Sequence, residues 1–304
     1  MLNSKTINST VNDYYSDLNT KILAVKSHNR NVLNNIEGFN ELENKIGNLK
    51  LKLAKAEYNN DTNKCKEINA QIALLSTKLN DIVKSASLIK YKYQCPICKD
   101  TGYINNKQCK CYLMQASKVI LNELGIKNQT DYSLKQSNGV EELKKHYAVA
   151  QNYVNDFPST KVNNFIFTGT VGSGKTHLSK CIFTELTVKG NNCIYLSSNE
   201  LNNLFIKMHV GEIDRVLTFE MLTESDLLVI DDLGTEPIYN NVTAEYFLPL
   251  ISTRLQYNKH FIITTNLTHN EIKARYGERL LSRLSNQNET MFVTFPNQDL
   301  RKMQ

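Results

Sequence analysis

The sequence of 304 residues predicts an α/β protein built on a five-stranded parallel sheet that helices flank on both faces. Short apolar runs of strand length alternate with longer periodic segments throughout the second half of the chain. Because these runs are apolar along their whole length, they indicate strands that are buried on both faces, as in a parallel sheet. The predicted strands are residues 164–169, 193–198, 226–232, 260–266 and 290–295.

The first part of the chain predicts helices. Apolar residues recur at steps of three and four between residues 42 and 53 and again between residues 65 and 82, which is typical of one-sided helices. Turn-forming residues at 59–63 separate the two segments, so we expect an antiparallel hairpin. A self-contained helical bundle and a docking arm for a partner protein both fit this pattern. We assign residues 1–90 to a helical N-terminal region.

Four of the seven cysteines lie close together, within residues 91–115. Thiolates on two short spacings can close a tetrahedron around Zn²⁺. An iron–sulfur cluster and unligated thiols are the alternatives, whereas a thioredoxin-type redox pair needs a βαβ frame that is not apparent here. Because all four coordination positions would be filled by protein, we expect a structural zinc module. The predicted ligands are Cys95, Cys98, Cys109 and Cys111.

Composition and charge narrow the class of protein. With 41% hydrophobic and 22% charged residues, the chain has the composition of an ordinary globular protein. The sequence has no apolar stretch near the ~18–20 residues of a membrane span and no signal-peptide core, so we expect a cytoplasmic protein without membrane contact. Residues 1–115 hold 17 Lys and Arg against 10 Asp and Glu. This excess fits a nucleic-acid partner, an acidic protein or a merely solvated surface.

A phosphate-binding loop directly follows the first predicted strand. The stretch GTVGSGKTHL (residues 169–178) matches the pattern G-x-x-x-x-G-K-T in the required context of strand, loop and helix. In this pattern backbone N–H groups converge on phosphate oxygens, the lysine reaches the β- and γ-phosphates, and the threonine ligates Mg²⁺. The residues predicted to contact the nucleotide are Gly169, Gly172, Ser173, Gly174, Lys175, Thr176 and His177.

Two carboxylates end the third predicted strand, in LLVIDDLG (residues 227–234). Burying Asp231 and Asp232 would cost several kcal/mol each without a compensating cation or hydrogen bonds. We expect Asp231 to hold Mg²⁺ and Asp232 to polarise the attacking water; a solvated turn is the alternative. Asn266 ends the fourth predicted strand, where it could contact the γ-phosphate, orient the water or only cap the next helix.

These motifs together resemble the AAA+ ATPase core of the DnaC/DnaI bacterial helicase loaders, with the transposition helper IstB as a close relative. The resemblance covers residues 116–304 and is carried by GTVGSGKTHL, VIDDLGTE (229–236), FIITTNL (261–267) and GERLLSRL (277–284). It implies an arginine finger for a neighbouring subunit's nucleotide, at Arg283 with Arg279 one turn earlier. AAA+ proteins typically carry Glu at the position of Asp232, whereas this group typically carries Asp. The shorter side chain implies slow, partner-timed hydrolysis of ATP to ADP.

The resemblance also implies a function in DNA replication. The N-terminal helices and the zinc module would bind the replicative hexameric helicase, while the core would bind ATP and single-stranded DNA and assemble with other copies on ATP. Lys207 and Arg215, between the second and third predicted strands, are candidate DNA contacts. The alternatives are an IstB-like transposition helper that acts on duplex DNA and a nucleotide-gated adaptor with negligible turnover.

Overall fold

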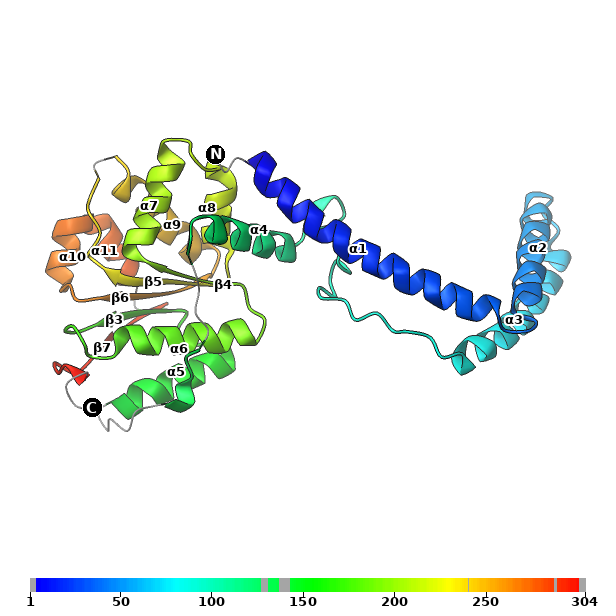
Figure 1. Ribbon diagram of the computed structural model, residues 1–304, viewed down its shortest axis with the longest axis horizontal. Helices are drawn as coiled ribbons and strands as arrows, with labels where there is room; N and C mark the ends of the chain where they lie inside the picture. The colour runs from blue at the N-terminus through cyan, green and yellow to red at the C-terminus, as the bar shows by residue number, and fades with distance from the viewer. Residues whose placement is uncertain (1–3, 127–130, 137–142, 240, 287–288, 301–304) are drawn as a thin grey trace. The chain divides into compact units, whose positions relative to one another are not determined.

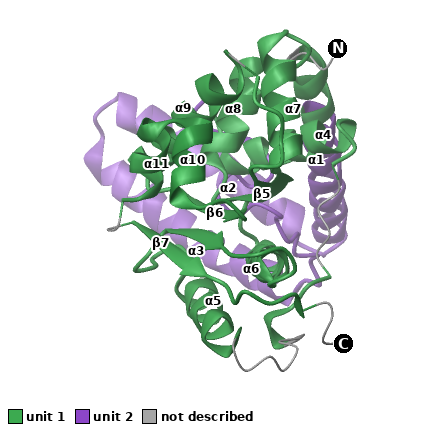
Figure 2. Ribbon diagram, turned by 90° about the vertical axis from the view of Figure 1, so that its left-hand side faces the viewer, with its two compact units in different colours: residues 1–11, 108–304 green, residues 12–107 purple. Residues whose placement is uncertain are grey.

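The computed structural model describes residues 4–126, 131–136, 143–239, 241–286 and 289–300. The chain forms two compact units, which Figure 2 distinguishes by colour: residues 1–11 with 108–304, and residues 12–107. The helices are α1 (Ser4–Asn34), α2 (Phe39–Tyr58), α3 (Thr62–Ser85), α4 (Lys110–Glu123), η1 (Leu134–Gln136), α5 (Lys144–Asp156), α6 (Lys175–Val188), α7 (Ser198–His209), α8 (Arg215–Glu224), α9 (Thr243–Gln256), α10 (His269–Tyr276) and α11 (Glu278–Leu284). The strands are β1 (Tyr103–Ile104), β2 (Lys107–Gln108), β3 (Asn164–Thr168), β4 (Cys193–Ser197), β5 (Leu227–Leu233), β6 (His260–Thr265) and β7 (Thr290–Thr294).

The larger unit contains a five-stranded sheet in the order β4-β5-β6-β3-β7. All pairings in it are parallel, so the predicted fold class is confirmed. The first four residues of β5 and all six of β6 are buried, because both faces of the sheet are covered. Each such apolar side chain contributes about 1.5–3 kcal/mol to folding through its burial.

Helices cover this sheet on two sides. Helix α6 contacts β4, β5 and β6 on one face, and α5 packs against α6. Helices α7 and α9 contact the sheet from the other face, and Figure 1 shows the two sets of helices on opposite sides. Because the strands are parallel, the loops after β3, β5 and β6 all emerge at one edge of the sheet, where ligands bind in folds of this kind.

An irregularity in β5 sets the direction of the two carboxylates. The register between β5 and β6 shifts between Ile230 and Leu233, so Asp231 and Asp232 lie in a bulge. Asp232 has φ 59°, in the left-handed region that residues other than glycine seldom adopt. Bulges of this kind re-aim side chains next to functional sites.

The smaller unit confirms the predicted helical N-terminal region. Helices α2 and α3 pack against each other, and the Asp61 side chain begins α3 by accepting a hydrogen bond from the backbone N–H of Lys64 (3.1 Å). The hairpin of β1 and β2 turns through two residues with positive φ at 105–106, which is the two-residue turn that suits strand twist. Across the described residues, no helix combines the length and the apolar character needed to cross a membrane.

Candidate functional site

The loop between β3 and α6 wraps around a cavity of about 450 Å³. Gly169 has φ 147° and Gly174 has φ 99°, conformations in which a residue with a Cβ is strained. A Cβ on Gly169 would also lie 3.0 Å from the Cβ of Phe295. Glycine at these positions therefore lets the backbone turn tightly, so that the N-terminus of α6 faces the cavity with its N–H groups and its dipole.

Lys175 holds the loop to a neighbouring strand. Its side chain is buried, and its ammonium donates to the carbonyl oxygens of Gly169 (2.8 Å) and Thr170 (2.7 Å). A third hydrogen bond runs to Oδ1 of Asn266, just after β6 (2.8 Å). Burial lowers the pKa of Lys175, and two nearby carboxylates oppose that shift. The ammonium thus lies in the lining of the cavity, where it can meet the negative charge of a phosphate.

The donors that could hold Mg²⁺ lie together on α6, β5 and β6. Oδ1 of Asp231 accepts hydrogen bonds from the hydroxyls of Thr176 (2.9 Å) and Thr264 (2.6 Å). Carboxylate and hydroxyl oxygens are hard ligands, and Mg²⁺ in nucleotide sites is held by one or two such groups together with phosphates and water. Asp231 and Thr176 therefore fit this metal, which supplies charge neutralisation along the phosphates.

Asp232 points to the same cavity and is tied to Asn266. Its backbone N–H donates to the Thr264 hydroxyl (2.8 Å), and its Oδ1 accepts from Nδ2 of Asn266 (3.1 Å). Burial raises the pKa of Asp232, and repulsion from the Asp231 carboxylate adds to the rise. A carboxylate with a raised pKa accepts a proton more readily, which suits a group that activates water. Asn266 bonds both Lys175 and Asp232, and the residue that caps α10 is Thr268 rather than Asn266.

Two aromatic side chains, Tyr132 and the predicted contact His177, close another side of the cavity. Tyr132 lines it, and its ring lies edge-on to His177 at 5.6 Å between centroids. The ammonium of Lys180 lies 5.0 Å from the Tyr132 ring centroid. The pKa of His177 is lowered mainly by burial and further by repulsion from this ammonium. A neutral imidazole and a phenol ring offer flat surfaces on which a nucleotide base can stack. No local pattern marks Tyr132, because only the tertiary fold brings it to the loop.

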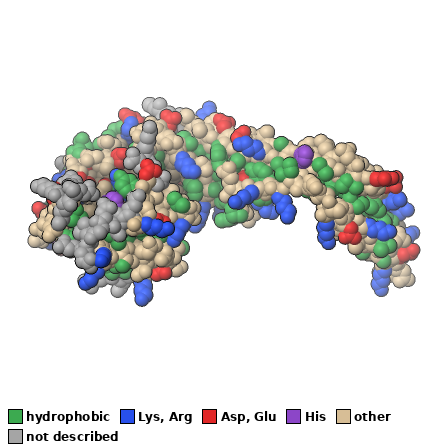
Figure 3. All heavy atoms as spheres, turned by 60° about the horizontal axis from the view of Figure 1, so that its bottom comes forward, with side chains coloured by type: hydrophobic (Ala, Val, Ile, Leu, Met, Phe, Trp, Pro, Cys, Tyr) green, Lys and Arg blue, Asp and Glu red, His purple; other side chains and the backbone are tan. Residues whose placement is uncertain are grey.

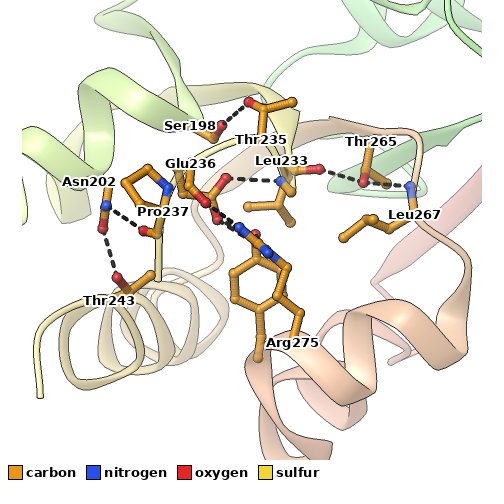
Figure 4. Close-up of polar contacts among 12 residues, drawn as sticks. Ser198, Asn202, Leu233, Thr235, Glu236, Pro237, Thr243, Thr265, Leu267 and Arg275 are labelled. Atoms are coloured by element: carbon orange, nitrogen blue, oxygen red, sulfur yellow. Dashed lines mark hydrogen bonds and ion pairs between the residues drawn. The ribbon is translucent and has the colours of Figure 1, made fainter. Parts of the chain in front are cut away.

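A buried carboxylate fixes the loop that follows β5. Glu236 is 2% exposed and accepts hydrogen bonds from the backbone N–H of Gly234 (2.9 Å) and the hydroxyl of Tyr276. Arg275 donates to the carbonyl oxygen of Glu236, and Figure 4 shows Arg275 directed at this loop. These bonds connect the segment after Asp232 to α10, immediately before the helix that carries the two predicted finger arginines. Glu236 is the last residue of the motif VIDDLGTE (229–236), but the sequence alone indicated no role for it.

The predicted finger residues lie outside this cavity. Arg279 and Arg283 are exposed on α11, four residues apart and hence on one helix face. Together with Leu248 and Ser252 of α9 they line a separate surface hollow of about 620 Å³. The structure therefore places both arginines where they can reach another molecule, not their own chain's cavity.

The two candidate DNA contacts lie on neighbouring helices. Lys207, near the end of α7, forms an ion pair with Glu212 (3.3 Å). The guanidinium of Arg215, which begins α8, lies 5.2 Å from the Tyr246 ring centroid. Neither residue lines the cavity described above.

The four cysteines of the predicted zinc module converge. Their sulfur atoms all lie within 4.8 Å of one another, at Cys95, Cys98, Cys109 and Cys111. Tetrahedral coordination at a Zn–S distance of ~2.3 Å requires sulfur atoms about 3.8 Å apart, so the donor set fits Zn²⁺ closely. The backbone N–H of Gly102 donates to Sγ of Cys98 (3.3 Å), a contact that stabilises a thiolate. The group fits a structural metal site better than a redox pair.

A parallel sheet that presents a phosphate-binding loop and an aspartate pair at one edge defines the core of a P-loop nucleotide-binding protein. The chain belongs to the family described as IstB-like ATP binding protein, whose pattern matches residues 114–293. The resemblance proposed from the motifs is therefore confirmed at the level of the family.

Two curated helicase loaders and one solved structure are similar to part of this chain. The replicative helicase loader DnaC of Buchnera aphidicola subsp. Schizaphis graminum is 27% identical over 156 residues, covering 50% of this chain and 61% of that protein. DnaC of Escherichia coli (strain K12) is 28% identical over 139 residues, covering 44% and 55%. The chain thus spans less than two thirds of the length of these relatives. The crystal structure of a DnaC helicase loader has a TM-score of 0.49 at 21% identity, covering 55% of this chain and 97% of that one.

Proposed function

We propose that this protein hydrolyses ATP slowly and loads a replicative DNA helicase onto single-stranded DNA. The observation that carries the proposal is the convergence of the loop lysine, an aspartate pair and Asn266 on one cavity, in a chain related to DnaC. The cavity of about 450 Å³ is of a size that suits a bound nucleotide.

Each polar residue of the cavity has a distinct role in this proposal. Backbone N–H groups of the loop and the ammonium of Lys175 bind the phosphates. Thr176 and Asp231 hold the magnesium ion, and Asp232 orients the attacking water with help from Asn266. Since Asp232 is one methylene shorter than glutamate, it positions water less well, and we expect slow turnover until a partner adjusts the site.

Assembly completes the site in this proposal. Arg283, assisted by Arg279, reaches the nucleotide of a neighbouring copy and stabilises the negative charge that develops during hydrolysis. ATP therefore holds copies together, and its hydrolysis releases them. Lys207 and Arg215 would contact the DNA strand beside this assembly.

In this proposal the N-terminal region and the zinc module bind the helicase. Large apolar side chains on α2 and α3 are exposed although these helices also pack against each other: Leu51 (67%), Tyr58 (88%) and Leu74 (62%). The IstB-like family assignment favours a second candidate, a transposition helper that acts on duplex DNA.

Phosphate release measured with and without partners tests the proposal. We expect slow release by the protein alone and faster release when a hexameric helicase and single-stranded DNA are both present. Asp232→Asn should lower the stimulated rate by about 10²–10⁴-fold, because it removes a general base. Asp156→Asn, an exposed substitution on α5, is the matched control and should leave the rate unchanged.

The outcomes separate the candidate functions. Stimulation by duplex DNA and a transposase, without any by a helicase, would support the transposition helper instead. Absence of turnover with every partner, despite tight ATP binding, would support the nucleotide-gated adaptor.

A further inference from the structure

The positive charge of the smaller unit is concentrated in one short segment. Residues 12–107 contain 15 Lys and Arg against 10 Asp and Glu, but residues 12–83 contain 10 against 9. Residues 84–107 therefore hold nearly all of the excess, in five lysines and one aspartate. The lysines, all exposed, are Lys84, Lys90, Lys92, Lys99 and Lys107.

The single aspartate of this segment does not offset the charge at the surface. Asp100 is 1% exposed, and its carboxylate accepts hydrogen bonds from the backbone N–H groups of Gln94 (3.0 Å) and Cys95 (2.6 Å). A zinc ion with four thiolates would carry a charge of −2. Even if all of that charge is assigned to this segment, two positive charges remain.

Part of the segment is held extended along α1. Asn29 exchanges two hydrogen bonds with the backbone of Ile89 (both 2.8 Å), and the Tyr14 hydroxyl donates to Oε1 of Gln94 (2.5 Å). The 15 helical steps from Tyr14 to Asn29 span about 22 Å. The five steps from Ile89 to Gln94 cover most of that distance, about 17 Å, only when the chain is nearly fully extended.

Because this segment is extended, the side chains of KYKY (residues 90–93) lie alternately on two sides. Lys90 and Lys92 are exposed, whereas Tyr91 and Tyr93 are half-buried with ring centroids 5.2 Å apart. Successive residues of an extended chain point to opposite sides. The two ammonium groups therefore lie on one side, about 6.6 Å apart along the backbone, as a row beside which a polyanion can run.

The same segment, residues 84–107, also exposes an aromatic ring and aliphatic side chains. Tyr103 (41%) and Ile104 (39%) are the two residues of β1, and Ile97 is 68% exposed between the first two cysteines. Figure 3 shows that lysine and arginine side chains and hydrophobic side chains are both exposed at the surface. Lysines together with an exposed aromatic ring are the combination that proteins use to bind unpaired bases and their phosphates.

We infer that residues 84–107 form a binding surface for single-stranded nucleic acid. The lysines contact successive phosphates, and Tyr103 stacks on a base. A duplex is a poorer ligand because its bases are already stacked and their faces are hidden. An acidic protein surface would satisfy the lysines but would give the exposed Tyr103 ring no base to stack on. This surface is separate from Lys207 and Arg215, and the inference does not depend on ATP hydrolysis.

Salt-dependent binding of fluorescent oligo-dT and oligo-U to the full-length protein tests the inference. Each lysine that contacts a phosphate of a single strand contributes about 0.7 to the slope of log K against log salt. Lys90→Ala/Lys92→Ala should therefore flatten the slope by about 1.4 and weaken binding roughly 25-fold at 0.1 M salt. The matched control, Lys50→Ala/Lys52→Ala, removes two exposed lysines with the same spacing from α2 and should change neither quantity.

A second measurement locates the contact independently of affinity. An oligonucleotide carrying 5-iododeoxyuridine should cross-link on irradiation to a peptide within residues 84–107. Tyr103→Ala should reduce that cross-link at least about fivefold, since stacking contributes that much or more to binding; Tyr58→Ala on α2 should not. The inference is overturned if both double-lysine variants bind alike, or if cross-links map only to the larger unit.

Discussion

Replacing Arg283 with alanine will lower the maximal rate of ATP hydrolysis by about 10³–10⁵-fold while leaving ATP binding near that of the parent protein. Arg283 is exposed on α11 and lies outside its own chain's nucleotide cavity. Its proposed contribution is to stabilise transition-state charge in a neighbouring copy, so its loss affects the chemical step and not ground-state binding. Stimulated phosphate release and calorimetric ATP binding measure the two quantities separately.

Mixing variants shows whether the arginine acts between copies. Arg283→Ala retains an intact loop, and Lys175→Ala retains an intact finger. Each should be inactive alone, whereas an equal mixture should recover part of the parent rate because some interfaces combine the two intact halves. Lys273→Ala removes an exposed charge from α10 and serves as the control. Full activity of Arg283→Ala, together with loss in Arg279→Ala, would move the finger to Arg279.

Removal of zinc will unfold the segment that contains the four cysteines. Structural zinc in small modules contributes an apparent ~10–16 kcal/mol, and residues 95–111 bury too little apolar surface to fold without it. Chelation should therefore release one zinc per chain and let trypsin cleave rapidly after Lys99 and Lys107, because the backbone at these exposed lysines is no longer held in the folded module. Metal analysis combined with timed proteolysis measures both events.

Single substitutions separate metal binding from general damage. Cys98→Ser removes a buried ligand and should abolish zinc retention, whereas Cys65→Ser on α3 changes a cysteine outside the cluster and should leave it intact. A parent protein that carries no zinc and resists cleavage at both lysines would contradict the assignment.

The strands and the main chemical groups were predictable because their signals are local. A half-buried strand alternates apolar and polar residues, whereas the segments that form β3, β5 and β6 contain runs of consecutive apolar residues. These runs therefore predicted a sheet that is covered on both faces. Likewise, the four cysteines lie within 17 residues, and a chain that short brings its ligands together with little loop entropy.

The features that the sequence did not predict depend on contacts between distant segments. Asp232 adopts its left-handed conformation because β5 bulges against β6, and nothing in the letters DD specifies a bulge. Glu236 and Tyr276 are 40 residues apart, so their contact emerges only from the packing of α10 beneath the loop. The extended path of residues 89–94 along α1 could not be predicted either, because the hydrogen bonds that hold it come from the distant residues Asn29 and Tyr14.

Calorimetric titration of Mg²⁺–ATP into the parent protein and into Lys175→Ala is the most direct test of the central claim, that a nucleotide occupies the cavity of the loop. Each charge-assisted hydrogen bond to a phosphate contributes about 1.5–3 kcal/mol, so the variant should bind at least about tenfold more weakly. Lys189→Ala at the end of α6 should bind as the parent does. Equal affinity of the parent and Lys175→Ala would contradict the account.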